Sequence, residues 1–222
     1  ARSGAVDALD IASPEAMRPL LVAALATAGR PILLVTSTYR EAETLTASLT
    51  SILTPDAVAY YPAWETLPHE RLSPRSDTVG RRLSVLRRLA GNDPLPAPRV
   101  VVAPIRAVLQ PQVTGLGGIL PVTFVAGEDF DIDTVAQALV DAAYIRVDLV
   151  ERRGEFAVRG GIVDVFPPTE EHPVRIDFFG DTVEEIRHFQ VADQRSDADT
   201  LPSITASPCR ELLISDAVRA RA

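Results

Sequence analysis

The chain lacks lysine altogether, so all 22 of its basic residues are arginine, and it has a single cysteine. With Cys209 alone it can form neither an intrachain disulfide nor a thiolate metal cluster, which fits a reducing compartment. No apolar run approaches the ~20 residues of a membrane helix. The first residues also lack the basic and apolar segments of a secretory signal. We therefore expect a cytoplasmic protein with no membrane partner.

The residues that would support ATP chemistry are also absent. A phosphate loop needs a glycine-rich turn followed by Lys-Ser/Thr at the start of a helix, and the chain has no lysine to supply. The histidines, His69, His172 and His188, are too few and too scattered to indicate a metal site. No Ser-His-Asp or Cys-His spacing indicates nucleophilic catalysis. The sequence predicts a chain that is not an enzyme, with no catalytic, cofactor-binding or metal-ligating residues and no cofactor.

The charge balance is acidic, with a formal net charge of −8. A broad DNA-binding surface needs dense positive charge, so any contact with DNA must be local. One predicted helix, 77–90 with Asp77 as its cap, carries two arginine pairs. Its apolar positions, Val79, Leu83, Leu86 and Leu89, should face inward, and Arg81, Arg82, Arg87 and Arg88 should be solvated. A minor role of these pairs in DNA contact stays open.

The first half of the chain alternates predicted helices with predicted strands. Helices are expected at 13–28, 41–53, 77–90 and 104–109, the first with Ser13 as its N-cap, and strands at 31–36, 57–60 and 99–103. The continuous apolar run at 31–36 is typical of a strand covered on both faces. This alternation predicts an open, parallel α/β layer.

The texture changes from about Gly115. A helix at 131–143 is followed by predicted strands at 145–151, 155–159, 162–167, 174–179 and 183–191, with glycine turns between several of them. Short strands with tight turns favour hairpins and an antiparallel sheet. The second half should therefore be a smaller α+β domain.

The strand 174–179 should have two chemically different faces. Period-two alternation sends Arg175, Asp177 and Phe179 to the face opposite the core, and the same alternation turns Arg159 outward. An exposed aromatic flanked by arginines is the composition of an interface hot spot.

A simpler interpretation also fits these residues. The arginines could merely pair with nearby acids such as Glu155, Asp177 or Glu184, while Phe179 caps the edge of the sheet. In the same way, Tyr61 and Trp64 are expected to be loop residues packed onto the first domain.

Two stretches are more particular than composition explains. The first is Tyr61-Pro-Ala-Trp-Glu-Thr-Leu-Pro-His-Glu-Arg-Leu-Ser-Pro-Arg-Ser-Asp, followed by Arg81-Arg-Leu-Ser-Val-Leu. The second is Arg153-Gly-Glu-Phe-Ala-Val-Arg-Gly-Gly-Ile-Val-Asp-Val-Phe-Pro, followed by Val174-Arg-Ile-Asp-Phe-Phe-Gly-Asp-Thr-Val-Glu-Glu-Ile-Arg-His-Phe. Together they resemble the N-terminal module of the bacterial transcription-repair coupling factors (Mfd), which is similar to the first domains of the excision-repair protein UvrB. The likeness covers nearly the whole chain.

The resemblance implies a fold and three segments. Residues 1–118 would be a degenerate P-loop/RecA-like α/β domain with a parallel sheet, and 119–206 a smaller, UvrA-binding α+β domain with an antiparallel sheet. Residues 207–222 would begin a following, truncated domain. The run Trp64-Glu-Thr-Leu-Pro distinguishes the family from UvrB, whose tyrosine-rich hairpin for damaged DNA has no counterpart in this chain.

The resemblance also implies a function. The chain would recruit UvrA to stalled RNA polymerase in transcription-coupled nucleotide excision repair, with Arg159, Arg175 and Phe179 as UvrA contacts and Asp177 in possible support. It would have no ATPase activity of its own. The parent protein would be an ATP-dependent DNA translocase whose later domains hold ATP and magnesium and contact RNA polymerase and DNA. A later domain would also mask the docking surface by an intramolecular contact. The alternative is a UvrB-like domain that binds nucleotide and DNA.

Overall fold

The computed structural model describes residues 8–67, 70 and 72–213 of the chain. The chain divides into two compact units. The first unit contains residues 1–63 and 88–111, and the second contains residues 64–87 and 112–222. No helix among the described residues is long and apolar enough to cross a membrane.

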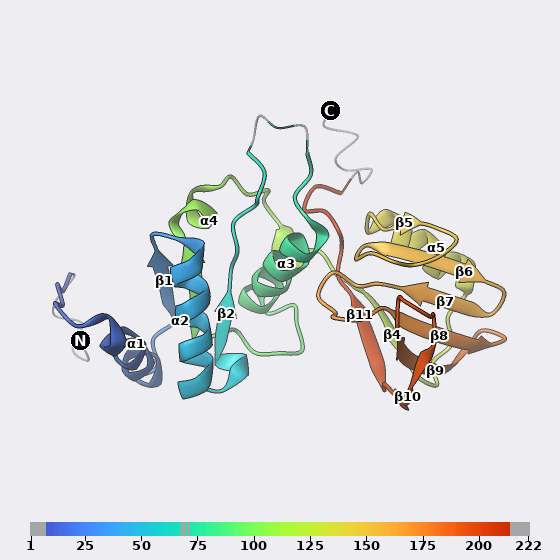
Figure 1. Cartoon of the computed structure of the whole chain (residues 1–222), viewed down its shortest axis with the longest axis horizontal. Helices are drawn as coiled ribbons and strands as arrows, with labels where there is room; N and C mark the ends of the chain where they lie inside the picture. The colour runs from blue at the N-terminus through green and yellow to red at the C-terminus, as the bar shows by residue number, and fades with distance from the viewer. Residues whose placement is uncertain (1–7, 68–69, 71, 214–222) are drawn as a thin grey trace. The chain divides into compact units, whose positions relative to one another are not determined.

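The first unit is a small α/β layer (Figure 1). Its strands β1 (Ile32–Thr36), β2 (Val58–Tyr60) and β3 (Val100–Pro104) form a parallel sheet in the order β1-β3-β2. Its helices are η1 (Glu15–Met17), α1 (Arg18–Thr27), α2 (Tyr39–Ile52), η2 (Pro55–Ala57) and α4 (Ile105–Leu109). Side chains from α1 and α2 pack on one face of the sheet, where Leu45, Leu49, Val100 and Val102 are buried. The predicted parallel α/β layer is confirmed.

Three local details of the first unit differ from expectation. Ser13 is not a helix cap, because the first helical turn begins at Glu15 after Pro14 and no side chain caps it. Helix α2 begins earlier than the predicted residue 41, because the Thr38 hydroxyl accepts a hydrogen bond from the Glu41 backbone N–H at 3.2 Å. Strand β1 is not covered on both faces. Leu33 and Val35 are exposed on the side away from α1 and α2.

The second unit contains a mainly antiparallel sheet with helix α5 (Ile132–Asp141) packed against it (Figure 1). Helix α3 (Ser76–Ala90) begins in this unit and its last three residues, 88–90, belong to the first. The other elements are η3 (Leu116–Gly118), β4 (Val122–Val125), α5 (Ile132–Asp141), β5 (Ile145–Arg146), β6 (Glu155–Arg159), β7 (Ile162–Val165), β8 (Val174–Phe179), β9 (Thr182–Phe189), β10 (Ser196–Thr200) and β11 (Ser203–Ala206). Six strands form one sheet in the order β10-β9-β8-β7-β6-β5, and β11 pairs with β4.

The core of the second unit lies between α5 and one face of the six-stranded sheet. Phe156, Ile176 and Ile186 from the strands are fully buried there, beside Leu139 of α5. Helix α5 begins where predicted, because Asp131 accepts a hydrogen bond from the Thr134 backbone N–H at 3.0 Å. The predicted α+β architecture with an antiparallel sheet is confirmed at this level. The finer description of the first unit as P-loop/RecA-like stays a prediction.

Several strand predictions need correction. The predicted strand 145–151 is only Ile145–Arg146, and it pairs with β6 in parallel and not in the antiparallel direction. Strands β4, β10 and β11 are additional to the predicted ones. Residues 196–200 lack an apolar alternation, whereas the short segments 122–125 and 203–206 do alternate and are strands that sequence reasoning missed.

The compact units also do not follow the predicted boundary after residue 118. Residues 64–87 and 112–118 group with the second unit, since Leu116 packs on Val79 and Leu83 of α3. Within 207–222, residues up to 213 are described and contact the second unit, where the Cys209 backbone N–H donates to the Ala142 carbonyl at 2.9 Å. Residues 214–222 lie outside the described part of the chain.

Candidate protein-interaction face

The face of the six-stranded sheet that points away from α5 carries polar side chains on β6, β7 and β8. The turn between β6 and β7 contains Gly160 in the left-handed region, with a φ of 60°. A Cβ on the next residue, Gly161, would lie 2.9 Å from the carbonyl oxygen of Phe178, so the close approach of β8 requires glycine there. The resulting register sets Asp164 directly opposite Arg175. A carboxylate of the central strand therefore faces an arginine of the next strand.

Asp164 is the centre of a charge cluster on this face. Its carboxylate is 1% exposed and accepts hydrogen bonds from Arg175 Nε at 2.7 Å and from Arg175 Nη2 at 3.0 Å. Arg159 Nη2 donates to the same carboxylate. The side-on contact with Arg175 is bidentate, which is the strongest arrangement for this pair of groups. One buried anion is thus compensated by two arginines.

Arg175 has further contacts that fix its position. Its Nη1 donates to the backbone carbonyl of Gln194 at 3.2 Å. Its guanidinium also lies over the ring of Phe189, 4.8 Å from the centroid. The hydrogen bond with Asp164 raises the pKa of Arg175 above its ordinary value, so this residue stays charged at any pH at which the fold exists. All three guanidinium nitrogens are therefore engaged within the chain.

A second row of charges lies next to the first. The strand register places Arg187 opposite Arg175, and Glu185 opposite Asp177. Like charges directly opposite one another are unfavourable. They are relieved because Arg187 Nη2 contacts Glu185 at 2.7 Å and Asp177 at 3.5 Å. Asp177 therefore pairs with Arg187 and not with either predicted contact arginine.

Phe179 ends β8 at the same side of the sheet. Its side chain is 79% exposed, although an aromatic ring of this size usually contributes to a core. Gly180 follows with a φ of 64°, which allows the tight turn into β9. The ring is therefore held outward at the end of a strand by a short hairpin.

The structure brings the predicted site residues to one face. Arg175, Asp177 and Phe179 alternate with the inward Val174 and Ile176, as predicted, and Arg159 also points outward. The alternation is confirmed, whereas the role of these residues in binding a partner stays a prediction.

Sequence reasoning missed the acid that organises this face. Asp164 pairs with both arginines, whereas the acids considered were Glu155, Asp177 and Glu184. A signal was present. Asp164 stands in the alternating segment Ile-Val-Asp-Val after a two-glycine turn, and that hairpin directs it to the same face as Arg159.

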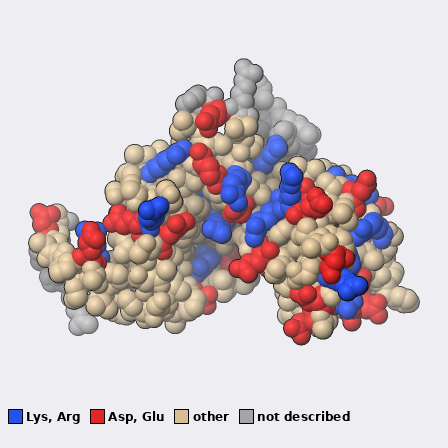
Figure 2. Space-filling model, viewed as in Figure 1, with Lys and Arg blue, Asp and Glu red and all other residues tan. Residues whose placement is uncertain are grey.

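The charges are mixed across this part of the molecule. In Figure 2 the arginines around the labelled strands β5 to β10 of Figure 1 lie among acidic side chains. Such a surface offers local positive groups without a broad cationic field, in agreement with the net charge of −8. It is suited to a shaped, polar protein contact.

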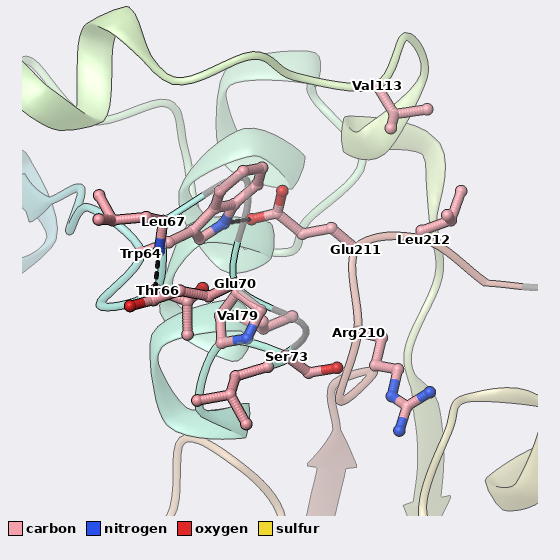
Figure 3. A pocket seen from close by; sticks show the side chains of 12 residues that line it. Trp64, Thr66, Leu67, Glu70, Ser73, Val79, Val113, Arg210, Glu211 and Leu212 are labelled. Atoms are coloured by element: carbon pink, nitrogen blue, oxygen red, sulfur yellow. Dashed lines mark hydrogen bonds between the residues drawn. The ribbon is translucent and has the colours of Figure 1, made fainter.

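A pocket in the second unit is formed around the Trp-Glu-Thr-Leu-Pro run (Figure 3). It has a volume of about 450 Å³, and Trp64, Leu67, Val79 and Leu212 are among its lining residues. The Trp64 indole N–H donates to the Glu211 carboxylate at 3.1 Å, which joins this loop to the segment after β11. Trp64 is therefore a packed loop residue, and these contacts lie within the second unit.

The arginine pairs of α3 are not a solvated face, so this prediction was wrong. Arg82 is 0% exposed; it lies over the Trp64 ring at 5.1 Å and forms an ion pair with Glu211. Arg87 and Arg88 are also buried, while Leu89, expected to face inward, is exposed. Hydrogen-bond acceptors outside the helix make this possible, since Arg87 donates to Ser207 and Arg88 to the backbone carbonyls of Asp56 and Pro96. Among these arginines Arg81 is exposed.

The described residues also include a cysteine and two histidines, which are the other candidates for reactive or metal-binding groups. Burial raises the pKa of the Cys209 thiol to about 12, so it is a poor nucleophile. The rings of His172 and His188 lie 6.2 Å apart, but no group of three or more His, Cys, Asp or Glu residues in the described ranges could hold a metal ion. His69 lies outside the described residues.

The comparisons with known proteins agree with this arrangement. Residues 122–211 match the family model of the UvrB interaction domain, a range that contains the whole six-stranded sheet and its charged face. The transcription-repair-coupling factor of Mycobacterium tuberculosis is 52% identical over 99% of this chain, which spans 18% of that protein. The transcription-repair-coupling factor of Bacillus subtilis is 38% identical over 92% of this chain and 17% of its own length.

The likeness is thus continuous across both units, and it is confined to less than a fifth of each relative. The described residues add a mixed α/β unit followed by a mainly antiparallel one, with the UvrB interaction domain in the latter. The chain therefore belongs to the transcription-repair coupling factor family, as a counterpart of its N-terminal, UvrB-like module.

Proposed function

We propose that the second unit is a docking module for UvrA and that Arg159, Arg175 and Phe179 form the contact face. The observation that carries the proposal is the 79% exposure of Phe179 on the face of the sheet that also carries the arginine cluster. Aromatic and arginine side chains dominate the energy of protein interfaces, and a preformed face loses little entropy on binding. By recruiting UvrA, the chain would bring excision repair to a stalled RNA polymerase.

The test is a calorimetric titration of purified UvrA into this chain and its variants. Arg159→Ala and Phe179→Ala should each weaken binding by about 2 kcal/mol or more, roughly 30-fold in the dissociation constant. Arg146→Ala and Leu120→Ala are matched controls, because both side chains are exposed in the second unit away from the proposed face. Each control should change the affinity by less than about 0.5 kcal/mol.

The outcomes separate the candidate functions. If UvrA does not bind the unsubstituted chain, the proposal is overturned. Binding that the face variants and the controls weaken equally would place the contact elsewhere on the chain. The affinities of the four variants for UvrA can be compared directly, because each variant removes a side chain that the fold leaves exposed or half-exposed.

A UvrB-like role in binding nucleotide and DNA is the alternative, and the first unit argues against it. At the start of α2, directly after β1, the Glu41 carboxylate accepts hydrogen bonds from the Ser37 backbone N–H at 3.3 Å and hydroxyl at 3.0 Å. Arg18 pairs with the same carboxylate at 3.0 Å. An anion of the chain itself thus occupies the helix start at which a phosphate would otherwise bind. A fluorescence titration with labelled ATP or duplex DNA should show no saturable binding at physiological salt.

The remaining roles concern the longer protein. The chain spans less than a fifth of the curated relatives it matches, so we propose that ATP- and magnesium-dependent translocation, and the contacts with RNA polymerase and DNA, belong to other parts of the parent. A later domain would cover the docking face until polymerase is engaged, a population shift between an internal and an external partner. The isolated chain should then bind UvrA constitutively, and adding the covering domain in trans should compete with UvrA.

A further inference from the structure

The two arginines of the docking face are not equivalent. Arg175 is 16% exposed, and its nitrogens contact Asp164 and the Gln194 carbonyl. The Arg159 side chain is 44% exposed, and its contact with Asp164 is through Nη2. Arg175 is therefore part of the framework of the sheet, whereas Arg159 presents much of its guanidinium to solvent.

Asp164 joins the two arginines. It belongs to β7, between the strands that carry Arg159 and Arg175, and its carboxylate is almost fully buried. A buried carboxylate is tolerated only when hydrogen bonds and opposite charge compensate it, and each arginine in turn is held by it. Without this anion, two like charges would face one another across a single strand. One side chain thus helps to position both guanidinium groups.

We propose that Asp164 is the positioning residue of the docking face. It locks Arg175 flat against the sheet and holds Arg159 in the orientation that a partner meets, so that Arg159 and Phe179 make the direct contacts. This inference rests on the proposed docking of UvrA. The physical basis is preorganisation, because an arginine already fixed in its bound position loses less conformational freedom on association.

Asp164→Asn tests the role with little change of shape. The amide keeps an oxygen for one hydrogen bond but removes the charge and a second acceptor, so both arginines should be released. We expect UvrA to bind about tenfold more weakly, the effect of ordering one arginine side chain on association. Asp141→Asn is the matched control. It removes the same charge from an exposed position at the end of α5, on the other side of the sheet, and the affinity should change less than about twofold.

A double-variant cycle distinguishes positioning from general damage. If Asp164 acts through Arg159, then Asp164→Asn should add little to the loss caused by Arg159→Ala alone, so the two effects should be non-additive. Additive effects would show that Asp164 acts independently of Arg159 and would overturn the proposal. Thermal unfolding of each variant, followed by circular dichroism, establishes that the compared proteins are folded.

A measurement on the free chain does not depend on UvrA or on a substitution that folds. In side-chain NMR spectra the Arg175 Nε–H, which donates to Asp164, should exchange with water much more slowly than the Nε–H of the exposed Arg146. Equal exchange rates for the Nε–H groups of Arg175 and Arg146 in the unsubstituted chain would overturn the positioning role. In Asp164→Asn the Arg175 signal should lose its protection, and in Asp141→Asn it should keep it.

The two possible failures remain distinguishable. If the unsubstituted chain does not bind UvrA, the proposed docking and the positioning role that rests on it are both overturned. If the unsubstituted chain binds UvrA and Arg159→Ala weakens binding, but Asp164→Asn behaves like Asp141→Asn, then docking stands and the positioning role alone is overturned. A tenfold, non-additive loss with loss of Arg175 protection supports the proposal.

Discussion

Removing the buried guanidinium of Arg82 should destabilise the second unit strongly. Arg82 is 0% exposed, lies over the Trp64 ring at 5.1 Å and forms an ion pair with Glu211. Arg82→Ala leaves the Glu211 carboxylate in the same buried position with the Trp64 indole as its remaining donor among these contacts. Breaking one side of a buried pair typically lowers the free energy of unfolding by about 3–5 kcal/mol. That is a large part of the ~5–15 kcal/mol that stabilises a typical domain.

Urea unfolding followed by tryptophan fluorescence measures this loss directly. The chain has a single tryptophan, and it lies in the cluster itself, so the signal reports on this part of the second unit. With a slope of about 2 kcal/mol per molar urea, the midpoint should fall by roughly 1.5–2.5 M. The slope should not change, because the surface exposed on unfolding is nearly the same.

Two controls separate the ion pair from the loss of an arginine as such. Arg81→Ala removes an exposed arginine from the neighbouring position of the same helix and should shift the free energy by less than about 0.5 kcal/mol. Arg82→Met combined with Glu211→Leu removes both charges and should restore most of the loss. If Arg82→Ala shifted the midpoint no more than Arg81→Ala, the reasoning from burial would be refuted.

Two further predictions concern the sheet and the cysteine. Gly161→Ala should lower the free energy of unfolding by about 1–3 kcal/mol, because its Cβ would lie 2.9 Å from the Phe178 carbonyl oxygen. Gly118→Ala, with open space at that position, is the control, and equal urea midpoints would contradict the prediction. Cys209 should resist a thiol reagent at about pH 8 until urea unfolds the chain, since burial raises its pKa to about 12. Rapid labelling of the native chain would contradict the prediction that Cys209 is protected. Because the folded pKa exceeds the ordinary value of 9.0, the stability that depends on the neutral thiol is complete below about pH 9 and is lost as the pH rises toward about 12.

The face of the candidate site followed from local pattern alone. In β8 the alternation of Val174, Arg175 and Ile176 is regular, and a strand allows only two side-chain directions, so the outward position of Phe179 could be predicted. The pairing of the charges could not. Whether an outward arginine forms an ion pair with Asp164, Asp177 or Glu184 depends on the register between strands, and local sequence pattern does not specify that register.

In helix α3, which carries the arginine pairs, local pattern gave a wrong prediction. Spacing placed Arg82, Arg87 and Arg88 on a polar stripe, because charged residues rarely leave water without a partner. Their partners come from residues 56, 96, 207 and 211, all of which lie outside α3, and all but residue 96 are far from it in sequence. Burial of a charge is decided by what the rest of the chain supplies, so helical periodicity alone gave the wrong answer at these positions.

The sequence by itself determined what is written in short-range pattern and in residue types. It specified the strand and helix alternation of the first unit, the antiparallel texture of the second, the lack of a lysine for a phosphate loop, and the motifs that lead to the family. These follow from steric periodicity and chemical inventory, which act within a few residues. The tertiary structure decided the grouping of residues 64–87 with the second unit, the burial of Arg82, and the shared carboxylate of Asp164. The first two depend on contacts between segments distant along the chain, and the third depends on the register between neighbouring strands. In each case the balance of desolvation against pairing is set only after folding.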